Sequence, residues 1–272
     1  MRRCLHKIVK GVMDLLQDYK GFWTLKVKIV ILTALGVGGA TIFGAVLGLI
    51  FKKITERRTN AVLAFAAGVM MAAAMIGLIF PALEYGGKYG VITATLGIFL
   101  GALSVNLLDM LLPCIMRLGG HKNDDEGLRG VFLFVGAIAI HNLPEGIAAG
   151  VGFGTGEIGD AILIATAVAL QNIPEGMIVF LAMLGAGISR GRTFFIAAMT
   201  GVVEIIGTFI GYFAVSISSA VLPFALAFAG GTMLYVISDE LIPDTHSREG
   251  GHLATYFLLI GFTFMLIFDA II

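Results

Sequence analysis

Two short polar segments interrupt the apolar stretches of this chain and have nearly the same sequence. One reads HNLPEG over residues 141–146, and the other reads QNIPEG over residues 171–176. Each lies in a stretch apolar enough to cross a bilayer, where a central acidic side chain costs about 2.5–3.5 kcal/mol on insertion scales. Such groups persist inside a membrane mainly where they line a polar path or bind a ligand. The repeat is therefore the strongest indication of function in the sequence.

The spacing within each hexapeptide suits a metal ion. On a helix, residues three and four positions apart share a face, so His141 and Glu145 point the same way and Asn142 lies one step round. The second hexapeptide repeats this arrangement with Gln171, Asn172 and Glu175. Neutral imidazole suits zinc, and carboxylate and amide oxygens suit harder ions. Two such helices facing one cavity would form a mixed nitrogen and oxygen site that binds several divalent metals.

The proline in each hexapeptide predicts a bend beside the site. Pro144 and Pro174 have no N–H, so the carbonyls of Ile140 and Leu170 lose their helical partners. Inside a membrane, freed carbonyls must be satisfied by neighbours, water or a ligand. We therefore expect two kinked helices at the centre of the protein.

A third acidic residue, Glu204, lies within another apolar segment, in addition to Glu145 and Glu175. No lysine or arginine is placed as deeply in the sequence pattern. Carboxylates without a counter-ion in a bilayer must be protonated, hydrated or bound to a cation. These three acids thus favour a cation-binding site.

The composition predicts an all-α protein that crosses the membrane several times. Hydrophobic residues make up 58% of the chain, charged residues 13%, and the mean hydropathy is +0.97, whereas soluble domains are about 25% charged. The formal net charge is zero, so nothing indicates a nucleic-acid partner. The 37 glycines favour close helix packing.

We divide the chain into two parts. Residues 1–27 form a basic amphipathic tail that we expect on the membrane surface, and residues 28–272 form the transmembrane domain. Eight segments in that domain are long enough to span a bilayer. They are residues 28–51, 60–82, 89–113, 130–152, 159–186, 193–217, 220–241 and 252–272.

The basic residues of the loops predict the orientation. Ten lysines and arginines lie in the loops after the first, third, fifth and seventh segments, whereas only Lys88 lies on the other side. Positive loops stay cytoplasmic, which places both termini outside the cell. The basic tail favours the opposite orientation, and we follow the four concordant loops.

At the two hexapeptides the chain resembles the ZIP (Zrt/Irt-like) family of divalent metal-ion transporters, and its prokaryotic GufA-type branch most closely. Two further segments are similar to that family, FAAGVMMAAA over residues 65–74 and YVISDELIP over residues 235–243. The resemblance covers the eight segments and leaves out the first 27 residues. It implies eight helices with both termini outside the cell.

The resemblance also implies a binuclear metal centre between the fourth and fifth segments, with two bridging glutamates. One site would use Met70, His141, Glu145, Gln171 and Glu175, and the other Asn142, Glu145, Asn172, Glu175 and Glu204. Glu84 would lie near the outer entrance, and Asp239, Glu240 and Asp269 along the release route.

The activity implied by the resemblance is import of Zn²⁺, together with Fe²⁺, Mn²⁺ and Cd²⁺, through the cell membrane. It further implies a homodimer and an elevator-like movement of a helix block. Two features depart from some family members. Asn172 replaces an aspartate, which predicts a weaker second site, and the loop over residues 114–129 holds only one histidine, His121.

Two other functions fit parts of the sequence. A proton-coupled carrier of an organic solute would also need deep carboxylates, although histidine and amides at ligand spacing fit metal better. An intramembrane metallohydrolase would need several zinc ligands, but His141 is the one histidine deep in a segment and no HExxH motif occurs. No P-loop is present, and we expect no organic cofactor.

Overall fold

The computed structural model describes residues 2–50, 56–118, 126–156, 158–246 and 251–271. Every regular element among these residues is a helix, which confirms the predicted all-α class. The single His121 of the loop over 114–129 lies outside the described residues.

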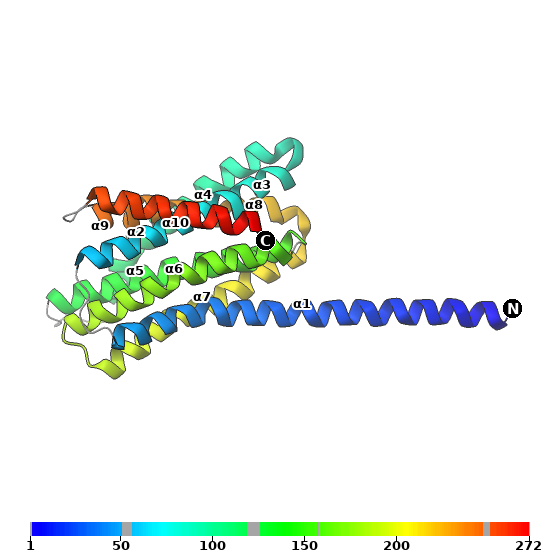
Figure 1. Ribbon diagram of the computed structural model, residues 1–272, viewed down its shortest axis with the longest axis horizontal. Helices are drawn as coiled ribbons and strands as arrows, with labels where there is room; N and C mark the ends of the chain where they lie inside the picture. Colours follow the sequence, from blue (N-terminus) through cyan, green and yellow to red (C-terminus); the bar gives the residue numbers. More distant parts are fainter. Residues whose placement is uncertain (1, 51–55, 119–125, 157, 247–250, 272) are drawn as a thin grey trace.

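The helices follow one another through short connections (Figure 1). The first half of the chain contains α1 (Arg2–Ile50), α2 (Glu56–Ala72), α3 (Phe80–Tyr85), α4 (Gly90–Leu118) and α5 (Glu126–Val151). The second half contains α6 (Ile158–Gly185), α7 (Arg190–Ile217), α8 (Leu222–Val236), α9 (Ile242–His246) and α10 (Gly251–Ile271). Two π-helical turns, η1 (Ala73–Ile79) and η5 (Ile237–Leu241), join α2 to α3 and α8 to α9. Three single 3₁₀ turns complete the order: η2 (Gly87–Tyr89), η3 (Gly152–Gly154) and η4 (Ser219–Val221).

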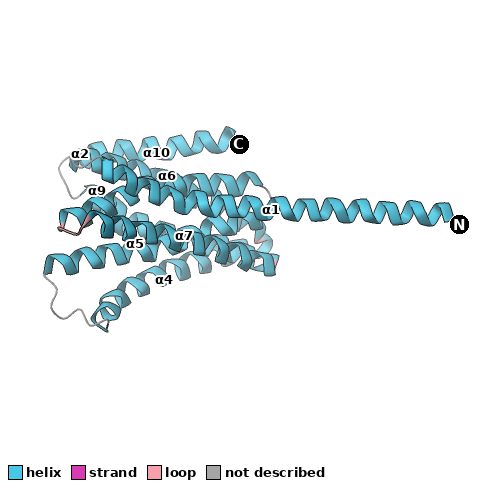
Figure 2. Cartoon of the chain, turned by 90° about the horizontal axis from the view of Figure 1, so that it is seen from below, coloured by secondary structure: helices cyan, strands magenta, loops and turns pink. Residues whose placement is uncertain are grey.

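The N-terminal part of α1 reaches well beyond the other helices (Figures 1 and 2). The helix has no interruption near residue 27, where the sequence predicted a boundary between a surface tail and the first span. The side chains before Lys26 lie outside the described residues, so the amphipathic tail over 1–27 stays a prediction.

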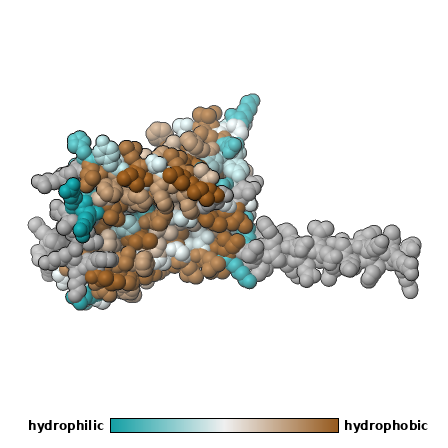
Figure 3. All heavy atoms as spheres, in the orientation of Figure 1, coloured by the Kyte–Doolittle hydropathy of each residue, from teal (hydrophilic) through white to brown (hydrophobic). Residues whose placement is uncertain are grey.

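Seven segments of the described residues are long and apolar enough to cross a membrane: Lys26–Ile50, Arg57–Tyr85, Gly87–Leu112, Ile158–Gly185, Arg190–Ile217, Leu222–His246 and His252–Ile271. They confirm a polytopic membrane protein. The remaining predicted span, 130–152, falls on α5, whose first side chains are not described, so the eighth span stays a prediction. On the face shown in Figure 3, apolar side chains cover the middle of the bundle and hydrophilic ones gather toward its ends.

The helices pack most extensively in two blocks. In the first block, α1, α5, α6 and α7 pack against one another, and in the second block α2 packs on α10 while α4 packs on α8. The second block is held together further by contacts of α8 with η1 and α3. Buried alanines, valines and leucines from α2, η1, α5, α6 and α8 fill the core between the blocks.

Glycines let backbones meet within each block. A Cβ atom on Gly176 of α6 would lie 2.0 Å from the carbonyl oxygen of Thr41 on α1, and one on Gly68 of α2 would lie 1.9 Å from that of Leu258 on α10. Across the block boundary the contact is softer, because a Cβ on Gly77 of η1 would first meet the side chain of Ile164 on α6, at 2.8 Å.

The helices continue without a break through Pro144 and Pro174, so the predicted kinks there stay predictions. The widened helical turns occur elsewhere, before Pro81 and Pro243. Each of these prolines lacks an N–H, and its ring crowds the carbonyl four residues earlier, which lies within η1 or η5. A π turn is a local response to such crowding and often marks a functional site.

Candidate metal centre

The polar residues of the two hexapeptides lie on neighbouring helices inside the first block. His141, Asn142 and Glu145 on α5 are buried, as are Gln171 and Asn172 on α6. Glu175 is half-buried, and Glu204 on α7 is 0% exposed. The structure therefore brings the predicted motif residues and the third acid into one region between α5, α6 and α7.

A hydrogen-bond cluster joins all four helices of the first block at Glu204. Its Oε1 accepts a hydrogen bond from Thr41 Oγ1 at 2.6 Å and another from Asn142 Nδ2 at 2.5 Å. Its Oε2 accepts one from Asn172 Nδ2 at 2.5 Å, and that amide also donates to the carbonyl oxygen of Val37 at 3.3 Å. Both carboxylate oxygens of Glu204 thus have donors supplied by the protein.

Apart from Glu175 Oε2, which accepts a hydrogen bond from Gln171 Nε2, the remaining motif oxygens have no such donors. Six buried side-chain oxygens of the hexapeptides lack a hydrogen-bond partner among the described residues: Asn142 Oδ1, Glu145 Oε1 and Oε2, Gln171 Oε1, Asn172 Oδ1 and Glu175 Oε1. Buried polar atoms in folded proteins nearly always have a partner. All six are acceptors, which fits a cation rather than an anion or a neutral apolar solute. Carboxylate and amide oxygens are ligands for divalent metals.

His141 faces a second cluster outside these oxygens. Its Nε2 lies 3.0 Å from Glu240 Oε1 of η5 and 3.6 Å from Asp109 Oδ1 of α4. One ligand atom from each of the three residues lies within 4.8 Å of the others, which is close enough to share a metal ion. This trio crosses the block boundary, because His141 belongs to the first block and Asp109 to the second, while Glu240 lies in η5, which packs on α8 and α2 of the second block.

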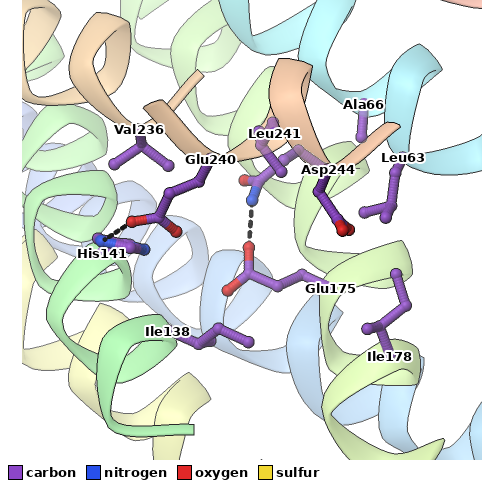
Figure 4. Close-up of a pocket in the computed structure, with 11 residues that line it drawn as sticks. Leu63, Ala66, Ile138, His141, Glu175, Ile178, Val236, Glu240, Leu241 and Asp244 are labelled. Atoms are coloured by element: carbon purple, nitrogen blue, oxygen red, sulfur yellow. Dashed lines mark hydrogen bonds and ion pairs between the residues drawn. The ribbon is translucent and has the colours of Figure 1, made fainter. Parts of the chain in front are cut away.

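A cavity of about 120 Å³ extends from the motif helices toward the middle of α2 and toward α9. His141 and Glu175 reach it from one side and Glu240 and Asp244 from the other (Figure 4). Gln171 Nε2 also donates a hydrogen bond to Glu175 Oε2. The apolar part of the lining comes from Leu63, Ala66, Ile138, Ile178, Val236 and Leu241.

The other residues predicted for the metal site or the transport path lie outside the hydrogen-bond cluster at Glu204. Met70 is 1% exposed and packs in the apolar core with residues of α5 and α6. Glu84 is exposed on α3, Asp239 is exposed in η5, and Asp269 is exposed near the end of α10. Of the predicted path residues, only Glu240 belongs to the cavity lining among the described residues.

Sequence reasoning assigned no role to Thr41, Asp109 or Asp244. Asp109 lies near the end of a predicted span, where an acid can simply be solvated, and Thr41 is one threonine in an apolar helix. Neither residue type nor spacing distinguishes these positions. Their roles emerge only from what lies opposite them.

Comparison with known proteins gives concordant results. The family model for the ZIP zinc transporter matches residues 117–269. The zinc transporter GufA of Myxococcus xanthus is 39% identical over 184 residues, which cover 67% of this chain and 72% of that protein. The zinc transporter ZIPB of Bordetella bronchiseptica is 33% identical over 237 residues (85% of this chain, 77% of that protein), and human zinc transporter ZIP11 is 30% identical over 319 residues (85% and 93%).

Proposed function

Because this chain belongs to the ZIP family of zinc transporters, we propose that it imports Zn²⁺ into the cytoplasm, with Fe²⁺, Mn²⁺ and Cd²⁺ as further substrates. The chain is a multi-pass membrane protein and a divalent-metal transporter rather than an enzyme. The observation that carries the proposal is the group of six buried oxygens without donors on α5 and α6.

The proposed substrate site is binuclear. Glu145 has both carboxylate oxygens free, and Glu175 has one free oxygen beside it on α6, so these two acids would bridge two ions. The amide oxygens of Asn142, Gln171 and Asn172 would complete the ligand sets. His141 and Met70 would serve the first ion, and Glu204 would support the second.

After the binuclear site, the metal would next bind to the trio of Asp109, His141 and Glu240. Imidazole and two carboxylates suit zinc, and the trio lies beside the cavity that reaches α9. The parts of the sequence that join α1 to α2 and α9 to α10 carry Lys52, Lys53 and Arg248, so the positive-inside rule would put the cavity, which Asp244 of α9 lines, on the cytoplasmic side. The cavity would then release metal into the cell.

The two-block packing supports an elevator-type cycle. In this proposal the first block (α1, α5, α6 and α7) carries the metal past the second block. Backbone-to-backbone glycine contacts would keep each block rigid, whereas side chains such as Ile164 at the boundary can yield. Eight spans, outward termini, a homodimer and a cell-membrane location complete the proposal and rest on the loop charges and the family resemblance.

The cavity argues against an organic substrate. Pockets for organic ligands commonly measure 300–1,000 Å³, whereas this cavity measures about 120 Å³. In uptake assays, competition by divalent metals and not by organic solutes is the expected result.

Zinc uptake into proteoliposomes tests the proposal. Glu145→Ala and Glu175→Ala should each lower uptake to the level of protein-free liposomes, because both bridging acids are needed to replace water around the ion. Asp160→Ala, which removes an acid from the first turn of the same helix α6, should transport like the wild type. Zinc uptake that persists in Glu175→Ala would overturn the assigned site.

A further inference from the structure

Thr41 uses its hydroxyl differently from other threonines of the fold. Thr95 donates to the carbonyl oxygen of Val91 at 2.7 Å, and Thr208 donates to that of Glu204 at 2.9 Å, both within their own helices. Such back-bonding is the ordinary behaviour of threonine in a helix. Thr41 instead donates to the Glu204 carboxylate, 163 residues away. Because Thr41 is 0% exposed, this hydrogen bond forms out of contact with water.

The Glu204 carboxylate in turn fixes the orientation of two amides. An amide group has its N–H donors on one side and its carbonyl acceptor on the other. Asn142 and Asn172 both turn Nδ2 toward Glu204, at 2.5 Å each. Their Oδ1 atoms are therefore the free ones, and both lack a donor. A metal binds an amide through its oxygen, so this orientation is the productive one for a cation site.

We propose that Thr41 is a positioning residue of the metal centre, which holds Glu204 so that Asn142 and Asn172 present their carbonyl oxygens to the metal. The inference rests on the proposed function, since it concerns the same substrate site. It extends that site to α1, from which neither hexapeptide comes. In this proposal Glu204 does more than bind metal: its carboxylate also accepts hydrogen bonds from Thr41, Asn142 and Asn172.

The geometry supports Thr41 as the anchor of this arrangement. Its backbone carbonyl is the atom that the absent Cβ of Gly176 would strike, at 2.0 Å, so α1 lies directly against the second hexapeptide. The Val37 carbonyl, one turn earlier on α1, accepts a second hydrogen bond from Asn172. Thus α1 fixes Asn172 both directly and through Glu204.

The test compares Thr41→Val with Thr41→Ser in proteoliposomes. Valine keeps the shape and removes the hydroxyl, whereas serine keeps the hydroxyl. Loss of a residue that orients a metal ligand typically costs 10- to 100-fold in affinity, so Thr41→Val should raise the half-saturating zinc concentration about 10-fold while the maximal rate is retained. Thr41→Ser should remain close to the wild type. Thr33→Val, the same change on the same helix in a groove between α1 and α6, is the matched control and should have no effect.

The metal itself offers a second measurement. Amide oxygens favour hard ions, so Thr41→Val should weaken Mn²⁺ uptake more than Cd²⁺ uptake. A loss of packing alone would weaken both equally. If the valine variant does not fold, Thr41→Ala removes the same hydroxyl with less bulk and undergoes the same assays.

The outcomes separate this inference from the proposed function. An unchanged half-saturating concentration in Thr41→Val, or equal impairment of Thr41→Ser and Thr41→Val, overturns the positioning role. The proposed function survives that result as long as Glu145→Ala abolishes uptake. Full uptake by Glu145→Ala would instead overturn the metal site itself, together with the role of Thr41.

Discussion

Adding one methyl group at Gly176 should separate α1 from α6 beside the proposed metal centre. In Gly176→Ala the new Cβ would lie 2.0 Å from the Thr41 carbonyl oxygen, 2.9 Å from its carbon and 3.1 Å from its Cα. All three atoms are backbone, so no side chain can turn away. Because carbon atoms do not approach an oxygen closer than about 3 Å, the helices must move apart by about 1 Å. Thr41 then moves away from Glu204, with which it shares a 2.6 Å hydrogen bond.

Overpacking of this kind typically costs about 1–3 kcal/mol, which corresponds to roughly 3–10 °C in the unfolding midpoint of a protein of this size. The midpoint can be followed in detergent by size-exclusion chromatography after heating. Gly36→Ala on α1 is the matched control, because a Cβ there meets nothing within 4 Å. Alanine should be neutral or slightly stabilising at that position, since it favours helix over glycine.

A graded series sharpens this test. A Cβ on Gly207 of α7 would meet the backbone oxygen of Leu143 at 2.5 Å, whereas one on Gly77 would meet a flexible part of Ile164 at 2.8 Å. The loss of stability should therefore fall in the order Gly176→Ala, Gly207→Ala, Gly77→Ala. Equal midpoints for Gly176→Ala and Gly36→Ala would refute the reasoning that backbone contact at glycine holds the first block together.

Three further results are expected. Asp109→Asn should slow the maximal rate of zinc uptake more than it raises the half-saturating concentration, because the trio with His141 is proposed to act after binding. A change in half-saturation alone would contradict that order. Tyr235→Phe removes the hydroxyl that accepts a 2.8 Å hydrogen bond from Asn106, so it should cost about 0.5–1.5 kcal/mol of stability and leave uptake unchanged, whereas a loss of uptake would place this pair in the transport path. Zinc at 100 times its dissociation constant should stabilise the purified protein by about 2.7 kcal/mol, and Glu145→Gln should abolish this gain, so a retained gain in the variant would indicate binding elsewhere.

Acids and amides within apolar helices are costly, so the sequence could point to them as candidate site residues. The two hexapeptides alone indicated Glu145, Glu175 and their amide neighbours, and helical periodicity put those of each hexapeptide on one face of its helix. The sequence could not identify the residues of other helices that contact these motifs. Thr41 looks like any membrane-helix threonine, and Asp109 like a solvated acid at a span end, since only tertiary packing brings them to Glu204 and His141.

Proline gave an incomplete local signal. A missing N–H predicts that a helix must adjust, but it does not fix the form of the adjustment. At Pro81 and Pro243 the helix widens into π turns, and at Pro144 and Pro174 the helices continue. The missing N–H is common to all four prolines, so it does not distinguish these outcomes.

The two hexapeptides differ at their first residue, and under the proposed function this difference has a physical consequence. His141 and Gln171 occupy the same place in the two hexapeptides, yet they face different partners. Gln171 turns its amide to Glu175 within the first block, whereas His141 lies 3.0 Å from Glu240 of the second block. An imidazole at that boundary can bind metal together with the first block and then share it with the acids of the second. Gln171 lines the same cavity as Glu240, but its amide donates to Glu175, so under the proposed function the contact across the boundary belongs to His141.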